Sequence, residues 1–422
     1  MEGYGVVSMD IDVIIVGGGA SGLFAAVLCA RYGAKVVVLE QKDRIGKKLL
    51  ATGNGKCNYT NFHIANNCYR GDNRDFTEIG LGTFGPEQAV ACWEELGIYP
   101  KNKNGYIYPY SEQASAVLDV LRMELDIQNV SVYCQEKVLD IAKNKGVFRL
   151  KTEKGHYTAK KVILATGGKS SPKLGSDGSG YTLAKKMGHS IVEPVPALIG
   201  LQCKEDYYKS ISGVRTEAEL SVYIDDNKKS RIREKGELQL TAYGISGIPV
   251  FQISRYAARA KAEGKKVQVQ IDYLPGVKKA VLDEMLKKRF RTKSKTAEEA
   301  CIGLLHKKLA SLFLRLSGIK TNMPAKAVSD EQRKKLVENI KALRTEVMDT
   351  NGFEQAQVTA GGVSTWEIAP DTMESILVPG LYFTGEVMDV DGICGGYNLQ
   401  WCWSSAYLAA DHIRKHIAPK NR

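Results

Sequence analysis

Three glycines near the N-terminus have the spacing of a phosphate-binding turn. Gly17, Gly19 and Gly22 follow the pattern G-x-G-x-x-G, in which backbone without side chains can approach a pyrophosphate closely. Glu40 follows Gly22 by eighteen residues, the distance at which a dinucleotide fold places an acid to accept hydrogen bonds from an adenosine ribose. Its negative charge disfavours a ribose 2′-phosphate. This spacing favours dinucleotide binding over a purely structural turn.

The flanking sequence predicts the elements that would position these groups. Residues 11–16 are a short apolar run, typical of a parallel strand buried on both faces. Residues 20–32 predict a helix, whose N-terminal amides and dipole favour a doubly negative diphosphate. Residues 35–39 predict a second strand that ends in Glu40. The chemistry therefore begins in a β-α-β unit.

Two later stretches repeat the pattern of a buried strand that ends in small residues. Residues 157–168 end in Ala-Thr-Gly-Gly, where a dinucleotide can lie close to the backbone. Residues 381–384 lead into Gly385-Glu386 and a glycine loop, and residues 397–416 predict a helix. Since this C-terminal segment is too short to fold alone, we expect it to rejoin the first sheet.

The intervening sequence differs in character. After Pro194 and Pro196, strands are predicted at 217–224, 237–240 and 267–273, a tight corner at 241–254, and helices over 278–316. Before it, we expect helices at 82–97, 111–125 and 181–187, and a small antiparallel sheet from 130–133, 138–142 and 148–152. The expected domains are residues 1–192 and 356–422, which together bind the nucleotide, and an insertion at 193–355.

Length and composition describe a soluble globular protein of two or three domains. The 422 residues are 44% hydrophobic and 25% charged, and no apolar run is long enough to span a membrane. The N-terminus lacks the basic and apolar regions of a signal peptide, and the nine cysteines form no C-x-x-C pair. We therefore expect a cytoplasmic protein with reduced thiols and no metal site.

The net charge of +12 suggests attraction to anionic ligands. Much of the excess lies between residues 261 and 326, where Lys and Arg mix with apolar residues at helical spacing. We interpret this pattern as a solvated basic helix face and expect no nucleic-acid partner.

The motifs together resemble one bacterial family. GGGASG, IGKKLLATGNGKCN, ATGG, PALIGL, TAGGV and GLYFTGEVMDVDGICGGYNLQ are similar to blocks of the BaiN/YhiN-type (HI0933-like) NAD(P)/FAD-dependent oxidoreductases. The resemblance runs from about Asp12 to His416, and ATGNGKCN and GEVMDVDG–GGYN are its most specific blocks. It implies an α/β fold: a glutathione-reductase-like FAD-binding Rossmann domain, discontinuous in sequence, with an inserted β-barrel-like plus helical domain.

The resemblance also implies which residues hold FAD. The first glycine turn would bind the diphosphate and Glu40 the ribose, while the helix that begins at Tyr397 would stabilise negative charge on reduced flavin. The implied cofactor-binding residues are Gly17, Gly19, Ala20, Ser21, Gly22, Glu40, Gln41, Lys48, Thr52, Gly53, Asn54, Gly55, Asn58, Val138, Ala165, Thr166, Gly167, Gly168, Gly385, Glu386, Asp391, Gly396, Tyr397, Asn398 and Leu399.

Members of this family are associated with reduction of conjugated C=C bonds in 3-oxo bile acids, and others with oxidation of small amines such as aminoacetone. We therefore expect an FAD-dependent oxidoreductase that acts on CH–CH groups of a carboxylate-bearing, steroid-like substrate. NAD(P)H would be a transient electron donor, because only one nucleotide fingerprint is present. An amine oxidase and a non-catalytic, RNA-associated flavin redox sensor are the rivals. The oligomeric state is left open.

The catalytic groups are less defined. Cys57, Tyr243 and Tyr397 are candidates because they are expected near the flavin ring. The family often has Thr-His-x-Gly where this chain has Thr241-Ala242-Tyr243-Gly244, so any proton transfer by that histidine is absent here. An ordinary barrel residue is the expected role of Tyr243. For Cys57 a packed thiol is expected, because no partner histidine is identifiable.

Overall fold

The structure is a computed structural model that describes residues 6–65, 67–225, 227, 229–291 and 294–417. It separates into two compact units, Met1–Pro194 with Ala356–Arg422, and Val195–Gln355. Within the described residues, no helix is both long and apolar enough to cross a membrane. Those residues also contain no group of three His, Cys, Asp or Glu side chains that could hold a metal ion.

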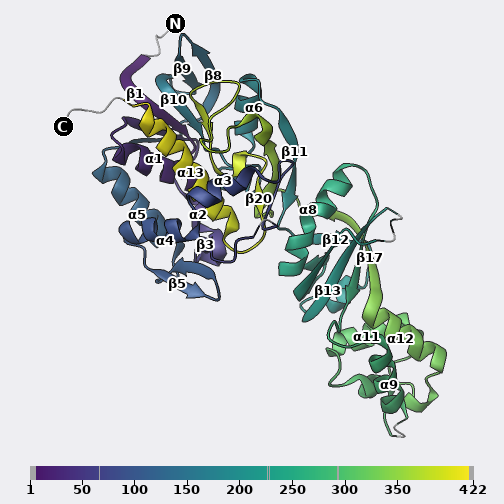
Figure 1. The fold of residues 1–422 in the computed structure, drawn as a ribbon. Helices are drawn as coiled ribbons and strands as arrows, with labels where there is room; N and C mark the ends of the chain where they lie inside the picture. The colour runs from purple at the N-terminus through teal and green to yellow at the C-terminus, as the bar shows by residue number, and fades with distance from the viewer. Residues whose placement is uncertain (1–5, 66, 226, 228, 292–293, 418–422) are drawn as a thin grey trace. The chain divides into compact units, whose positions relative to one another are not determined.

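A seven-stranded sheet forms the centre of the first unit (Figure 1). Five of its strands pair in parallel, and the other two extend it as an antiparallel hairpin. The strand order is β7 (Ser131–Cys134), β2 (Val36–Glu40), β1 (Val6–Val16), β10 (His156–Leu164), β9 (Val147–Thr152) and β8 (Val138–Asn144), with β19 (Leu381–Phe383) also paired to β10.

The C-terminal strand completes a sheet that starts at the N-terminus. β19 pairs in parallel with β10, next to the strand that leads into the glycine turn. The apolar runs of β1, β2 and β19 are buried on both faces, as in parallel sheets covered by helices. The expectation that residues 130–133 join a small antiparallel sheet is wrong, because β7 pairs in parallel with β2. So short a run of residues does not indicate which distant strand it pairs with.

Two helices from opposite ends of the chain, α1 (Ala20–Arg31) and α13 (Tyr397–Lys415), pack against each other beside the sheet (Figure 1). Phe24 of α1 packs against Trp93 and Trp403, with ring centroids 5.5 and 5.3 Å away, and the two tryptophan rings lie 5.0 Å from each other. The Trp403 indole N–H donates to the Tyr59 carbonyl at 2.8 Å. This aromatic cluster therefore ties α13 to the loop that carries the ATGNGKCN block.

Shorter elements surround these helices. The helix expected at 82–97 is α4 (Pro86–Glu95), while residues 82–83 end the preceding helix α3 (Phe76–Thr83). Pro86 occupies the first turn of α4, where its missing N–H costs nothing. The remaining elements of the unit are α2 (Lys47–Leu50), α3 (Phe76–Thr83), α4 (Pro86–Glu95), α5 (Ala114–Ile127), α6 (Ser179–Lys186), the sheet β3 (Thr60–Asn61), β6 (Tyr106–Pro109) and β5 (Pro100–Lys103), and the pairs β4 (Tyr69–Arg70) with β20 (Asp391–Gly392) and β11 (Ile191–Ala197) with β18 (Val358–Val363).

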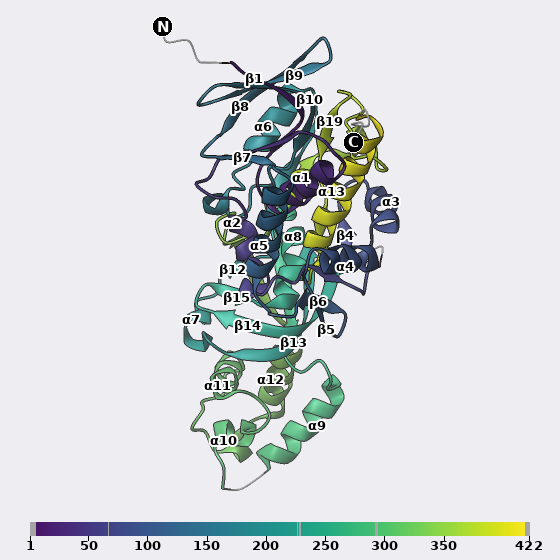
Figure 2. The ribbon, with the colours of Figure 1, turned by 90° about the vertical axis from the view of Figure 1, so that its left-hand side faces the viewer.

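The second unit is a closed barrel, and its helices between residues 279 and 342 gather at one end of it (Figure 2). Alternate residues of its strands, such as Ala218, Leu220 and Val222, are buried in its core. The barrel order is β12 (Leu201–Cys203), β15 (Gly244–Ser246), β14 (Ile232–Thr241), β13 (Arg215–Ile224), β16 (Val267–Asp272) and β17 (Leu343–Thr350), and the helices are α7 (Tyr208–Ile211), α8 (Ile248–Ala262), α9 (Lys279–Phe290), α10 (Ala297–Cys301), α11 (Lys307–Leu316) and α12 (Asp330–Ala342).

The predicted tight corner at 241–254 is only half right. Residues 241–247 do turn between β14, β15 and the next element, and Gly247 has a φ of 99°. From Ile248, however, the chain is helical, with Pro249 in the first turn of α8. Proline is well tolerated there, so reading it as the end of a regular element was wrong.

Candidate functional site

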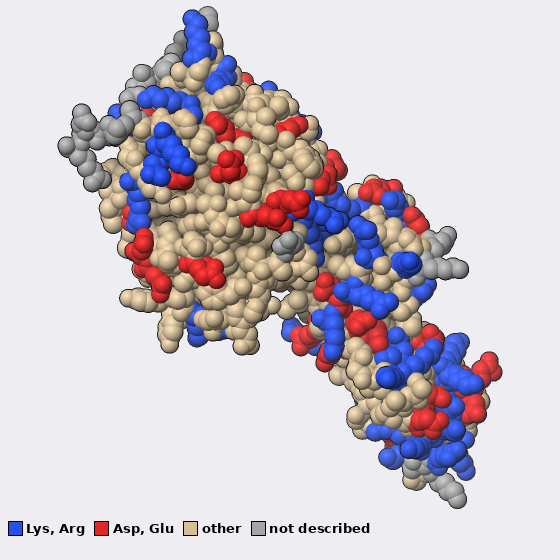
Figure 3. Space-filling model, in the orientation of Figure 1, with Lys and Arg blue, Asp and Glu red and all other residues tan. Residues whose placement is uncertain are grey.

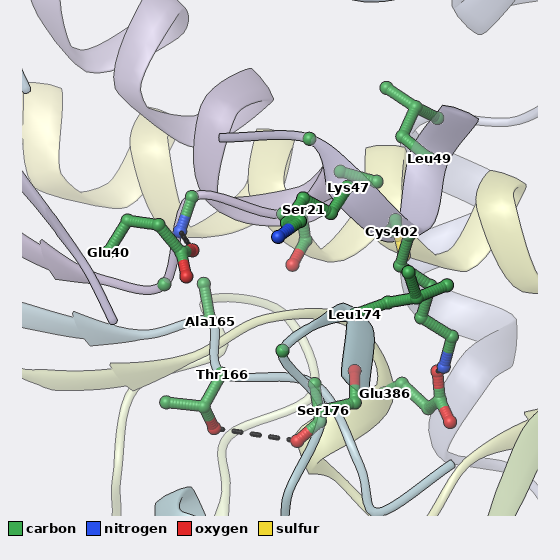
Figure 4. Close-up of a pocket in the computed structure, with 18 of the residues that line it drawn as sticks. Ser21, Glu40, Lys47, Leu49, Ala165, Thr166, Leu174, Ser176, Glu386 and Cys402 are labelled. Atoms are coloured by element: carbon green, nitrogen blue, oxygen red, sulfur yellow. Dashed lines mark hydrogen bonds and ion pairs between the residues drawn. The ribbon is translucent and has the colours of Figure 1, made fainter. Parts of the chain in front are cut away.

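A cavity lies where β1, β2 and β10 end, the edge at which open parallel sheets bind ligands (Figure 4). Its walls come from the glycine turn, α2, the loop before α6 and the start of α13, which are far apart in sequence. Figure 4 shows Glu40 at one end of the cavity, and Cys402 and Glu386 toward the other.

The three fingerprint glycines differ in what a side chain at each position would meet. A Cβ on Gly17, whose φ is 107°, would lie 2.5 Å from the Ala165 carbonyl oxygen, and one on Gly22 would lie 2.0 Å from the Gly17 oxygen. A Cβ on Gly19 would meet nothing within 4 Å. The first and third glycines are therefore required by packing, whereas the second leaves open space against which a ligand's phosphates can lie.

Glu40 is fixed by the backbone of the same turn. Its carboxylate accepts from the amides of Gly18 at 2.8 Å and Lys42 at 2.7 Å. The side chain is buried, and burial raises the pKa of its carboxyl although both hydrogen bonds oppose the rise. Because each carboxylate oxygen can accept more than one bond, Glu40 keeps acceptor capacity for ribose hydroxyls.

An ion pair joins α2 to the segment after β19. Lys48 Nζ lies 2.8 Å from Glu386 Oε2, and the Thr359 amide donates to Glu386 Oε1 at 2.8 Å. The Ser405 hydroxyl of α13 accepts from the neighbouring Gly385 amide at 2.9 Å. These bonds fix four segments relative to one another along this wall of the cavity.

The start of α13 is held by side chains. The Asn398 amide group bonds back to Gly392, accepting from its N–H at 2.8 Å and donating to its carbonyl at 2.9 Å. Gly396 has a φ of 95°, and a Cβ there would lie 2.7 Å from the Thr60 carbonyl oxygen. The first N–H groups of a helix have no carbonyl within the helix to donate to. Those of α13 can therefore donate to a negatively charged edge of a ligand.

Asn58 adds an acceptor next to these amides. Its Oδ1 atom is buried and accepts no hydrogen bond from the described protein atoms. A Cβ on Gly396 would lie 2.9 Å from this atom, which places it at the start of α13. A buried acceptor of this kind fits the N–H of a bound ring, because an unsatisfied one is costly.

Fifteen of the residues implied by the family resemblance line the cavity: Gly17, Gly19, Ala20, Ser21, Glu40, Gln41, Lys48, Thr52, Val138, Ala165, Thr166, Gly167, Glu386, Asn398 and Leu399. The others are not among its lining residues: Gly22, Gly53, Asn54, Gly55, Asn58, Gly168, Gly385, Asp391, Gly396 and Tyr397. Within that second group, residues 53–55 are exposed and Asp391 is buried.

Several lining residues escaped sequence reasoning, because no local motif marks them. Glu136 is buried, and its amide donates to the Glu40 carbonyl at 2.9 Å. Gly175 accepts from the Gln41 side chain at 2.6 Å, which brings the loop before α6 to the end of β2. The other missed residues include Arg44, Lys137, Leu174, Ser176, Ser179, Gln357, Val358, Val390, Trp401 and Cys402.

The three candidate catalytic residues are in different surroundings. Cys57 is fully buried, and burial raises the pKa of its thiol to about 12. Tyr397 donates its hydroxyl proton to the His63 carbonyl at 2.9 Å, and burial raises its pKa as well. Tyr243 is 38% exposed and lies in the second unit, in the turn between β14 and β15. Neither Cys57 nor Tyr397 is therefore ionised at neutral pH.

Known proteins resemble this chain over nearly its whole length. Residues 11–412 match the family described as HI0933-like protein Rossmann domain. The chain is 44% identical over 402 residues to the 3-dehydro-bile acid delta(4,6)-reductase of Clostridium scindens, covering 94% of this chain and 97% of that one. It is 32% and 30% identical to the ribosomal RNA dihydrouridine synthases of Haemophilus influenzae and Escherichia coli, covering 95% of this chain and 98% of each of them.

Proposed function

Because the chain belongs to the HI0933-like family and is an FAD-dependent oxidoreductase with a Rossmann fold, we propose that it reduces C=C bonds conjugated to a carbonyl group. The family and the fold predicted from the motifs are confirmed. We propose a 3-oxo steroid or bile-acid-like substrate and a nicotinamide electron donor. The observation that carries the substrate class is the 44% identity to a reductase of this kind over nearly all of both chains.

The residues of the first unit would bind and orient the cofactor, which supplies hydride transfer when bound. The turn at Gly17–Gly22 would hold the diphosphate, because a ligand meets no side chain at Gly19. Glu40 would accept from the ribose hydroxyls. The α13 amides would stabilise negative charge at the polar edge of the ring, and Asn58 Oδ1 would accept a ring N–H.

Reduction of an enone also needs a proton, which a protein residue or water must deliver to the carbon next to the carbonyl. Tyr397 and Cys57 keep their protons at neutral pH, but both are buried and neither lines the cavity, so we assign the proton transfer to neither of them. The second unit carries no nucleotide motif, and we propose it as the substrate-side domain. Tyr243, in the turn of its barrel, keeps the ordinary structural role expected from the sequence.

The test uses the purified holoprotein without oxygen. Chemically reduced enzyme is mixed with a 3-oxo-Δ4 bile acid, and the return of flavin absorbance is followed together with a mass gain of two hydrogens in the steroid. The saturated 3-oxo bile acid is the control, because it has the same carboxylate and ketone but no C=C bond. Reduction of oxidised enzyme by aminoacetone, with no reaction of the enone, would replace the reductase with the amine oxidase.

A second candidate is reduction of uridine in RNA. Two relatives that cover 95% of this chain are ribosomal RNA dihydrouridine synthases, and the C5=C6 bond of uracil is likewise conjugated to a carbonyl. Figure 3 shows Lys and Arg side chains gathered on the helical part of the second unit, where α9, α11 and α12 lie. Such a surface suits a phosphate backbone.

This candidate predicts that reduced enzyme forms dihydrouridine in unmodified ribosomal RNA, detected by mass spectrometry of the digested nucleosides. The bile-acid assay run beside it separates the two substrates. Salt-sensitive RNA binding without turnover of either substrate or of any electron donor would instead support the non-catalytic redox sensor.

A further inference from the structure

Three lysines converge on one carboxylate beside the β5–β6 hairpin. The Glu112 carboxylate lies 3.1 Å from Lys56 Nζ, 2.5 Å from Lys101 Nζ and 2.8 Å from Lys103 Nζ. Three positive charges therefore face one negative charge, which leaves a surplus of two. Each ammonium group has three N–H donors, so none is exhausted by its bond to Glu112. We call these four residues the lysine cluster.

Exposed aromatic rings stand next to the lysine cluster. Tyr99 and Tyr110 are 72% and 69% exposed, and the Tyr110 amide donates to the Tyr99 carbonyl at 2.8 Å. Lys101 Nζ lies 5.6 Å from the centre of the Tyr110 ring. Any nucleotide base can stack on an exposed tyrosine ring, and a neighbouring cation adds attraction for phosphate. Base-stacking and phosphate-binding groups thus occur together here.

The cluster is attached to both loops that the proposed function assigns to the flavin ring. Lys56 lies within the loop 52–58, and β6 pairs with β3, which follows that loop. On the other side, the Asn61 side chain donates to the Gly395 carbonyl at 2.9 Å. A Cβ on Gly395 would lie 2.7 Å from the Tyr106 ring of the same hairpin. The Tyr106 end of the hairpin therefore lies next to the start of α13.

We propose that the lysine cluster binds the ribose 2′-phosphate of NADPH, with the adenine stacked on the exposed pair Tyr99 and Tyr110. This inference rests on the proposed function and deepens it by naming the electron donor. A phosphate monoester carries about two negative charges near neutral pH, which matches the surplus of the cluster. Glu40 disfavours that group in the first nucleotide site, so the two sites would select different nucleotides.

The main test measures flavin reduction by NADPH and NADH in stopped flow without oxygen, for the holoenzyme and for the variant Lys101→Gln/Lys103→Gln. We expect the concentration of NADPH needed for half the limiting rate to rise on the order of tenfold, as for loss of two partly exposed charge contacts. The limiting rate and the half-saturating NADH concentration should not change. Lys186→Gln/Lys235→Gln is the matched control, since both lysines are exposed and paired with one carboxylate each.

Calorimetry with adenosine 2′,5′-bisphosphate and with 5′-AMP tests the site without any turnover. The oxidised holoenzyme should bind the bisphosphate more tightly, and the Lys101→Gln/Lys103→Gln variant should lose that preference. This readout stands even where neither nicotinamide reduces the flavin, an outcome that would defeat the proposed donor but not the phosphate site. Equal binding of both nucleotides by the unaltered enzyme would overturn the site itself.

Glu112→Gln should change the affinity for NADPH in the opposite direction. It removes the competing carboxylate, so NADPH should bind several-fold more tightly while NADH binding stays the same. An equal change for both donors in any cluster variant would contradict the proposal. So would a loss of RNA binding by Lys101→Gln/Lys103→Gln with unchanged NADPH kinetics, because the hairpin would then be a nucleic-acid surface.

Discussion

Two helices in the first unit begin after a glycine loop, yet the two starts are built differently. The turn before α1 is held by backbone packing: Gly22 lies against Gly17, and Gly17 against Ala165. The turn before α13 is held by side chains, with Asn398 bonded to Gly392, Asn61 to Gly395 and Tyr69 to the Tyr397 carbonyl. The first is a steric solution, in which a Cβ added at Gly17 or Gly22 would clash with backbone. The second is a polar network whose parts come from distant segments.

This difference separates two tasks. A rigid turn with open space at Gly19 suits a diphosphate, which needs only close backbone and a helix dipole. The α13 start must place amides against one edge of a ring, so its exact position matters more than its steric closeness. Changes at the first turn should therefore alter cofactor retention and stability, and changes at the second should alter the rate.

The largest effect is expected for Gly22→Ala. The new Cβ would lie 2.0 Å from the Gly17 carbonyl oxygen, a backbone atom that cannot move without displacing the turn. We expect a loss of about 3 kcal/mol of stability and little retained FAD, measured by thermal unfolding and by flavin absorbance per chain. Gly82→Ala in α3, where a Cβ meets nothing within 4 Å, is the control and should leave both unchanged or raise stability slightly.

Glu40→Ala should come next. It removes the expected bonds to the ribose and leaves the Gly18 and Lys42 amides without their acceptor. The free energy of FAD binding should weaken by about 1.5 to 3 kcal/mol, the usual range for hydrogen bonds to a charged group. Equilibrium dialysis of FAD measures this, and the cofactor released by heat should be FAD. Finding FMN would contradict the assignment of an adenosine half to this turn.

Asn398→Ala sharpens the contrast at the second start. It breaks two side-chain bonds that hold the loop at Gly392, so the α13 amides should shift relative to a bound ring. We expect FAD content near that of the unaltered protein but substrate reduction slower by about ten- to a hundredfold, since a lost donor to developing charge costs up to about 10³. An alanine inserted between Gly395 and Gly396 should have a larger effect of the same kind. If Asn398→Ala lost FAD while the rate per bound FAD stayed the same, the two helix starts would not have separate tasks.

The smallest effect concerns pH and a residue that belongs to neither start. His189 is buried, with Nε2 2.8 Å from the Ser375 hydroxyl, and burial lowers the pKa of its ring although Glu367 opposes the shift. A lowered pKa means that the unfolded chain binds the proton more readily. The stability that His189 contributes is therefore full above its ordinary value of about 6.5 and is lost as the pH falls below it.

His189→Gln should make the unfolding midpoint in urea less sensitive to pH between about 7 and 5, while the affinity for FAD stays unchanged. Measuring both quantities across that range checks the prediction. If the affinity for FAD fell more steeply with falling pH in the variant than in the unaltered protein, His189 would be coupled to the nucleotide turn.

The sequence by itself determined the features that depend on near neighbours. Gly17, Gly22 and Glu40 belong to one β-α-β unit, so their spacing alone encodes the turn and the position of the acid. The buried run at 381–383 likewise marked a strand of a covered sheet, and β19 does pair with β10. Motif blocks along the chain were also enough to predict the family.

Only the tertiary structure decided how distant segments meet. β7 was misplaced because a four-residue strand does not encode which edge it joins, and α8 was missed because Pro249 reads as a breaker until its place in the first turn is known. The bond from Gln41 to Gly175 brings the loop before α6 to the cavity, and nothing in the sequence marks that contact. The three lysines around Glu112 lie on separate segments, and long-range pairing of strands brings such charges together without leaving a pattern in the sequence.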